Sequence, residues 1–282
     1  MEANNQKFSH IDSDARIRDI LNSAETFEEV NEIPQRSRLT FSNGFYTKCA
    51  ALFIDIRESS SLPSKHTRPV TGKIYRAYLS ECVAVINSAS SCREVFINGD
   101  CVSGILNTPL MSDINAVFSL AAKLNSATNI LNWRLEKKGY SQIRCGIGLA
   151  YGRALMLKAG YSGSGINDVI WMGDVVNEAS NLCHMGNKEG RSVIQLSETI
   201  EQNLNARNKA FLTPVHGGLR ISHYECDVVY GEMNDWLKNE KEKSARAAIP
   251  MSGLIGLARQ PYTPTLLGSP QGGLGGLLST RW

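Results

Sequence analysis

Two acidic residues stand out because of the sequence around them. Asp55 lies near the end of an apolar run, Leu52-Phe-Ile-Asp-Ile56, where an unpaired carboxylate would be costly to desolvate. Asp100 lies in the turn Asn98-Gly-Asp100 between two apolar segments. Two carboxylates, helped by a backbone carbonyl such as that of Ile56, can hold a pair of hard divalent cations. Such a pair can activate a hydroxyl and bridge a triphosphate. The alternative is structural: Asp100 is a good turn residue and Asp55 caps a loop.

The segments around these acids are predicted to form a βαββαβ series. Apolar periodicity and turn residues predict its strands and helices at 49–56, 67–90, 93–97, 101–106, 112–138 and 143–150. This order is typical of the ferredoxin-like arrangement, so we expect an α+β fold. There the first strand lies beside the hairpin, which brings Asp55 and Asp100 to one point. Later in the chain, the pattern predicts strands at 168–172, 193–196 and 227–230 and a helix at 175–184.

Composition divides the chain into three parts. Residues 1–43 are predicted to be an N-terminal arm with a short amphipathic helix at 14–22, and residues 44–244 to be the folded domain. Residues 245–282 are rich in Gly, Pro and Leu without helical or strand period, which is typical of a flexible tail.

Several function classes are disfavoured by the same sequence. The net charge is only +3 and the basic residues are scattered, so a nucleic-acid partner is not expected. We find neither a run of about 18 apolar residues, as a membrane span needs, nor an N-terminal signal peptide. The seven cysteines show no CxxC pair or zinc-ligand spacing and are expected to be reduced thiols. These features favour a cytoplasmic protein.

Four segments resemble, in order and spacing, the class III adenylate and guanylate cyclase domain: 52–56, 97–101, 143–148 and 173–180. The resemblance covers about residues 45–240. It implies that Asp55, the Ile56 carbonyl and Asp100 bind two Mg²⁺ or Mn²⁺ ions and that Asn177 orients the ribose. It also implies a head-to-tail homodimer with active sites between the subunits, in which one chain provides the metal acids and the other reads the base.

Four positions depart from the purine cyclases of this class. Phe96 and Ile170 replace a lysine and an acid that commonly read the purine, so an adenine amine facing Ile170 would have no acceptor. Asn181 and Tyr230 stand at the positions of the transition-state arginine and a phosphate lysine. A purine cyclase, a catalytically silent nucleotide-binding domain and a pure dimerisation element therefore stay as alternatives.

Other arginines are candidates for the missing charge. In the resemblance, residues 56–61 would cradle the phosphates through backbone N–H groups. Arg57 in this loop is a candidate phosphate contact, and the alternative is a solvated surface arginine. Arg57 and Arg153 are both candidates to replace the absent transition-state arginine.

Three longer segments narrow the resemblance: 43–57, 75–81 and 158–168, the last running into 171–177. They look like the pyrimidine cyclases of the bacterial Pycsar anti-phage systems. Those enzymes make cyclic UMP or cyclic CMP on infection, and the messenger activates a separate effector. The resemblance implies UTP or CTP as the substrate. A pocket walled by Phe96 and Ile170 would suit the smaller ring of a pyrimidine base, and the hydroxyl of Tyr46 would bind the edge of that ring. Alternatively, Tyr46 is a core aromatic.

Overall fold

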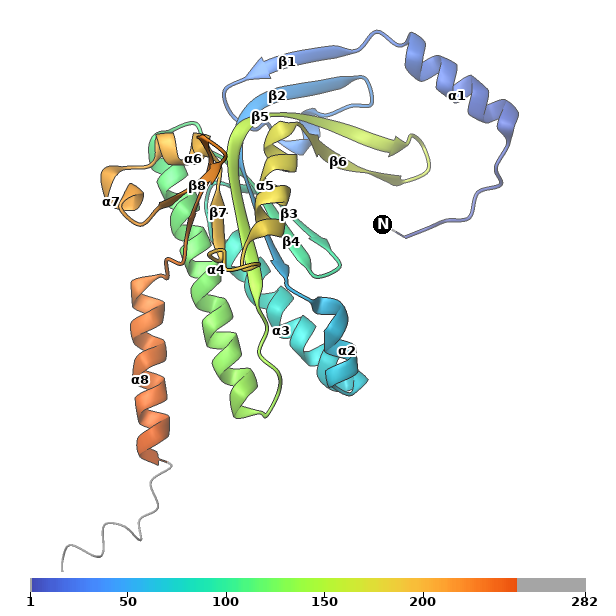
Figure 1. Cartoon of the computed structure of the whole chain (residues 1–282). Helices are drawn as coiled ribbons and strands as arrows, with labels where there is room; N and C mark the ends of the chain where they lie inside the picture. Colours follow the sequence, from blue (N-terminus) through green and yellow to red (C-terminus); the bar gives the residue numbers. More distant parts are fainter. Residues whose placement is uncertain (1, 248–282) are drawn as a thin grey trace, which may run out of the picture. The chain divides into compact units, whose positions relative to one another are not determined.

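A mixed sheet of nine strands organises the part of the chain that a computed structural model describes, residues 2–247 (Figure 1). The strands are β1 (Thr26–Val30), β2 (Asn43–Ile56), β3 (Cys92–Asn98), β4 (Cys101–Asn107), β5 (Cys145–Tyr161), β6 (Ile166–Met172), β7 (Ile194–Leu196), β8 (Thr213–Gly217) and β9 (Arg220–Cys226). Their order in the sheet is β3-β4-β2-β5-β7-β9-β8, while β1 pairs with β2 and β6 with β5. Residues up to Leu237 form one compact unit, and a second unit begins at Lys238.

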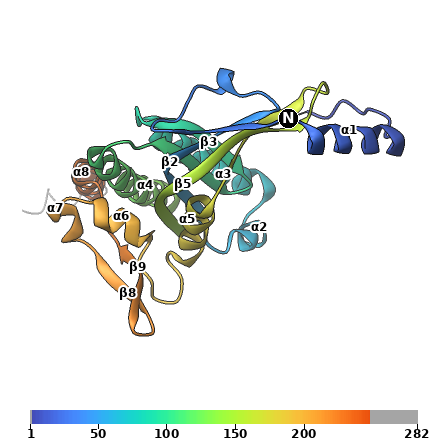
Figure 2. The ribbon, with the colours of Figure 1, turned by 90° about the horizontal axis from the view of Figure 1, so that it is seen from above.

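Helices cover both faces of the sheet. They are α1 (His10–Asn22), α2 (Leu62–Lys65), α3 (Arg68–Asn87), α4 (Met111–Lys137), α5 (Asp174–Met185), α6 (Glu198–Asn203), α7 (Ala206–Lys209) and α8 (Gly231–Ala247), with 3-10 turns at Arg36–Arg38 and Ser59–Ser61. α3 and α4 pack into a core on one face, and α5 packs into a second core on the other. Figure 2 shows the β8–β9 hairpin at the opposite side from β3. None of the helices within residues 2–247 has the length and apolar character that a bilayer crossing requires.

The long strand β2 explains how both cores form from one apolar run. Leu52, Ile54 and Ile56 belong to the core under α3 and α4. The alternate residues Cys49 and Ala51 belong to the core under α5, because successive side chains of a strand point to opposite faces. Asp55 continues this second row. The strand therefore delivers the carboxylate to the face that α5 covers.

Most predicted elements are confirmed, including the βαββαβ order and the α+β class. The predicted strand at 227–230 is wrong, because these residues form no strand and lead into α8. The strands of that region are β8 and β9, joined by a turn in which Gly218 has φ 75°. β8 contains a single aliphatic residue, Val215, polar residues dominate β9, and seven of the twelve residues in the two strands are exposed, so no apolar run indicates them.

Residues 1–43, which were predicted to be an N-terminal arm, contribute a strand and core residues to the fold. β1 pairs in parallel with β2 from Thr26↔Asn43 to Val30↔Thr47, and Ile33 and Leu39 are buried in the core under α5. α1 includes the predicted helix and buries no residue. Of the predicted tail, residues 248–282 lie outside the described residues, and 245–247 end α8.

Candidate active site

Asp55 and Asp100 meet at one end of β2, as predicted. Asp55 is next to last in β2, and Asp100 occupies the β3–β4 turn, where Gly99 has φ 65°. β4 pairs antiparallel with β2, with Ile54 opposite Val102, so the turn lies beside the end of β2. Burial raises the pKa of the Asp55 carboxyl, and the negative charge and hydrogen bonding of Asp100 raise it further. The two carboxyl groups therefore lie close enough to interact electrostatically.

The carboxylate pair suits a divalent cation. Asp100 Oδ2 is buried and has no hydrogen-bond partner among the described residues, and a buried polar atom normally has one. No group of three or more His, Cys, Asp or Glu within residues 2–247 is arranged to bind a metal. A cation here would thus be held by the two acids and by further oxygens, such as the backbone carbonyl of Ile56 or a substrate phosphate.

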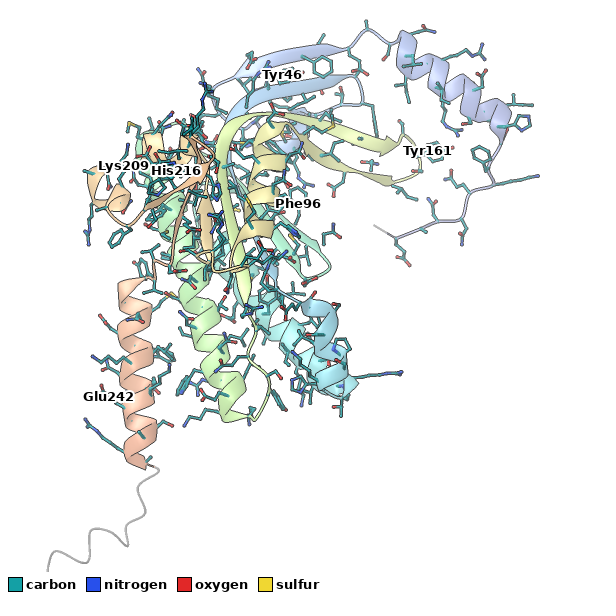
Figure 3. The ribbon with its side chains drawn as sticks, viewed as in Figure 1. Tyr46, Phe96, Tyr161, Lys209, His216 and Glu242 are labelled. Carbon is teal, nitrogen blue, oxygen red and sulfur yellow. The ribbon has the colours of Figure 1, made fainter. Side chains whose placement is uncertain are left out.

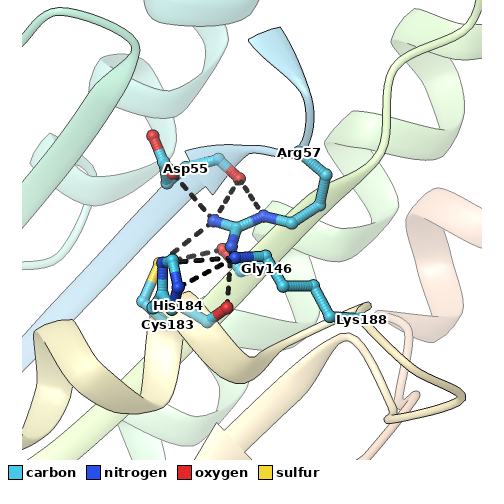
Figure 4. Close-up of polar contacts among 6 residues, drawn as sticks. All are labelled: Asp55, Arg57, Gly146, Cys183, His184 and Lys188. Carbon is cyan, nitrogen blue, oxygen red and sulfur yellow. Dashed lines mark hydrogen bonds and ion pairs between the residues drawn. The ribbon is translucent and has the colours of Figure 1, made fainter.

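Arg57 is not the solvated surface arginine of the alternative interpretation, and its guanidinium has several partners within the chain. Its side chain is only 2% exposed. The guanidinium donates to Asp55 Oδ2 at 2.8 Å, to the Asp55 carbonyl at 3.1 Å and to the His184 carbonyl at 3.0 Å (Figure 4). Its charge lowers the pKa of Asp55 and so opposes the effects of burial and Asp100. Arg57 therefore holds the carboxylate of Asp55 by an ion pair and a hydrogen bond from the buried side.

A first cavity, of about 530 Å³, opens beside these acids. Its wall includes Asp55, Phe53, Phe96 and Ser103. Ser103 pairs with Phe53 on one side and with Phe96 on the other, so the three side chains form a row across β2, β4 and β3. Phe96 thus lines the same cavity as Asp55, two strands away.

Asn177 and Asn181 line a second cavity, of about 570 Å³, between α5 and the β8–β9 hairpin. Helical periodicity places them on one side of α5, whereas Ser180, Cys183 and His184 face the first cavity. Figure 3 shows Phe96 and His216, which line the first and second cavities respectively, on either side of α5. Within one chain, the structure therefore does not bring Asn177 to the carboxylates.

Two other predicted residues also lie away from the acids of their own chain. Tyr46 precedes Asp55 by nine residues on β2, which corresponds to roughly 30 Å of extended strand. Its ring lies under the Arg153 guanidinium at 3.8 Å, and Arg153 is also ion-paired with Glu29. Ile170 is 37% exposed on β6, opposite Leu157. Arg153 is thus engaged with β1 and Tyr46 rather than with the carboxylate pair.

A neighbouring cation was not anticipated from the sequence. Lys188 follows α5, and its ammonium lies 3.0 and 3.2 Å from the ring nitrogens of His184 (Figure 4). Its positive charge lowers the pKa of Asp55. No motif marks Lys188, because it approaches Asp55 only when the loop after α5 folds back.

The fold is similar to that of proteins of known structure. No protein-family model matches the sequence. The structure resembles the adenylyl cyclase CyaB of Pseudomonas aeruginosa with a TM-score of 0.54 at 18% identity, covering 65% of this chain and 95% of that one. The fold is therefore that of class III nucleotidyl cyclase domains.

Sequence relatives specify the family further. The chain is 38% identical over 232 residues to a uridylate cyclase of Treponema porcinum, which covers 82% of this chain and 81% of the relative. It is 42% identical over 197 residues to a uridylate cyclase of Gulbenkiania mobilis, which covers 67% and 76%. The chain therefore belongs to the uridylate cyclase family.

Proposed function

We propose that this protein converts UTP to 3′,5′-cyclic UMP and pyrophosphate. The observation that carries the proposal is the Asp55–Asp100 pair, with its unpartnered buried oxygen, in a relative of uridylate cyclases. In this reaction the substrate's own 3′-oxygen forms a bond to the α-phosphorus, and the bond from that phosphorus to pyrophosphate breaks. Two divalent cations, Mg²⁺ or Mn²⁺, would lower the pKa of the 3′-hydroxyl and neutralise the leaving group.

The protein's own residues supply position and charge. Asp55 and Asp100, with the Ile56 carbonyl, hold the cations. Arg57 keeps the Asp55 carboxylate in place through its buried hydrogen bonds, and Asn177 orients the ribose. Phosphoryl transfer of this kind depends mainly on positioning and electrostatics, so each of the two acids is expected to be essential.

We further propose that two copies pair head to tail to complete each site. Asn177 and Asn181 line a cavity on the other side of α5 from the acids of their own chain. In a head-to-tail pair they would serve the acids of the second copy, as the class III resemblance implies. Phe96, Ile170 and Tyr46 would belong to the base-binding side of such a composite site.

The biological setting is also a proposal. The segments that resemble Pycsar cyclases suggest a messenger role in anti-phage defence, in which the cyclic nucleotide acts on a separate effector. All seven cysteines are unpaired thiols, which suits the reducing cytoplasm. A rise in cyclic UMP in cells that carry the protein, on phage infection only, would support this role.

The activity is tested with ATP, GTP, UTP and CTP in parallel, with Mn²⁺ and product identification by mass spectrometry. We expect cyclic UMP as the main product, no product from Asp55→Ala or Asp100→Ala, and unchanged circular dichroism for both variants. Cyclic CMP as the main product would move the substrate assignment to CTP. Full turnover by either variant would refute the role of the acids.

A further inference from the structure

The wall of the second cavity includes one arginine side chain, Arg191. Its wall combines α5, the β8–β9 hairpin and the loop that leads from α5 to β7. At about 570 Å³ it has the size of a small-molecule site. Among the described residues that line it, Arg191 is the only Lys or Arg.

Charges are graded along this cavity. Asp174 and Glu178 lie in the first turns of α5, where burial and the charge of Asp174 raise the pKa of Glu178. Asn177 lies between these two acids in the sequence, Asn181 follows on the same side of the helix, and Arg191 comes from the loop beyond its C-terminal end. The direction from Asp174 to Asn181 along α5 therefore leads toward the loop that carries the cation. A ligand with its sugar at Asn177 and its phosphates beyond Asn181 would match this gradient.

Arg191 is also available, unlike the arginines first considered. Its side chain is 40% exposed, and its one ion pair, with Glu225, has a long N–O distance of 3.9 Å. Glu225 accepts two further hydrogen bonds, from the Ser192 backbone N–H at 3.3 Å and from Gln195 Nε2 at 3.1 Å. Glu225 is thus held without Arg191. Arg57, by contrast, is buried against Asp55.

We propose that Arg191 binds the phosphates of the nucleoside triphosphate whose cations are held by Asp55 and Asp100 of a second copy. It would supply the positive charge that Asn181 lacks. The inference rests on the proposed cyclase function and on the head-to-tail pairing.

Point variants test the role of this charge. For Arg191→Gln we expect kcat/KM for UTP to fall about tenfold to a hundredfold, which corresponds to the loss of one charge-assisted hydrogen bond. Arg191→Lys keeps a charge and should recover part of that loss. Glu225→Gln is the matched control, because it removes the ion pair and keeps an acceptor for Ser192 and Gln195; its activity should stay near wild type. An equal loss in Glu225→Gln would show that Arg191 acts only by holding the loop and would overturn the proposal.

Co-expression of an inactive variant with an impaired one tests which chain Arg191 serves. Mixed dimers of Asp55→Ala and Arg191→Gln should contain one intact site, which restores about a quarter of wild-type activity when the chains assort at random. Asp55→Ala with Asp100→Ala should restore nothing, because both acids belong to one chain. Asp55→Ala with Asn177→Ala is the positive control for pairing.

The outcomes separate the two proposals. Recovery in the mixture with Asn177→Ala but not in the mixture with Arg191→Gln would refute the proposed role of Arg191 and leave the cyclase function and the head-to-tail pairing in place. Wild-type protein that makes no cyclic nucleotide would instead refute the cyclase function itself.

Discussion

Asp100→Asn should make the metal-free protein more stable while abolishing its activity. Two ionised carboxylates about 4 Å apart repel by about 4 kcal/mol at an effective dielectric constant of 20. The Asp55 side chain is 31% exposed and Arg57 lies against it, and both features reduce this repulsion. We therefore expect the substitution to raise the free energy of unfolding by about 1 kcal/mol. For a folded unit of this size, that corresponds to a rise in Tm of roughly 2–4 °C.

Mn²⁺ should reverse the order of stability of the two proteins. At a concentration one hundred times its Kd, a bound ion stabilises the folded wild-type protein by about 2.7 kcal/mol. Asp100→Asn removes one of the two ionised ligands and should lose most of that stabilisation. Wild type should therefore be the less stable protein in EDTA and the more stable protein in Mn²⁺.

The assay is thermal unfolding at pH 7, followed by circular dichroism, in EDTA and in a Mn²⁺ titration. Asp19→Asn is the matched control, because Asp19 is an exposed acid on α1 and its loss should leave both Tm values unchanged. A lower Tm for Asp100→Asn in EDTA would contradict the repulsion between the carboxylates. A full Mn²⁺ shift in that variant would refute the metal site.

Two further predictions concern pH and packing. His223 is buried, with ring nitrogens 2.8 Å from Ser222 Oγ and from Gln195 Oε1; burial and the positive charge of Arg191 lower its pKa, and the charge of Glu225 partly opposes this. Because the unfolded chain binds that proton more readily, the stability from neutral His223 is present above the unfolded pKa of 6.5 and is lost as pH falls through it. Urea unfolding at pH 7 and pH 5 should show a smaller stability loss in His223→Gln than in wild type, and an equal loss would contradict this. Gly148→Ala should lower the free energy of unfolding by about 3 kcal/mol or more, measured with urea, because its Cβ would lie 2.1 Å from the Ala179 carbonyl oxygen and 2.2 Å from the Cys183 nitrogen of α5. The control is Gly72→Ala in α3, whose Cβ meets nothing within 4 Å and which should raise the free energy of unfolding by about 0.5–1 kcal/mol. Similar effects of the two substitutions would refute the close approach of α5 to β5.

The meeting of Asp55 and Asp100 was predictable because it depends on local signals. An apolar run identifies the strand, Asn98-Gly-Asp100 identifies the turn, and hairpin geometry sets β4 antiparallel to β3. Only the neighbour relation between β2 and β4 is long-range, and the βαββαβ order specifies it. The interior position of Arg57 was not predictable, because the carbonyl of His184 that it binds is 127 residues away in the chain.

Strand length explains why Tyr46 lies far from Asp55 of its own chain. It shares β2 with Asp55, and each residue adds about 3.3 Å, so the strand itself separates the two. The strand is longer than the apolar run 49–56 suggested because β1 and β5 extend its pairing to Asn43 and Gly44. β1 escaped notice because two glutamates interrupt its apolar residues, as is common in a strand with an exposed face.

The amino-acid sequence by itself determined the α+β class, the order of the core elements, the two acids and the cyclase resemblance, because apolar periodicity and turn chemistry act over a few residues. The tertiary structure decided which arginine side chains are available to bind a phosphate. It buries Arg57 beside Asp55, engages Arg153 with Glu29 and Tyr46, and places Arg191 in the wall of the cavity that Asn177 and Asn181 also line. Charged side chains take their partners from segments far away in the chain, and only the folded backbone brings those segments together.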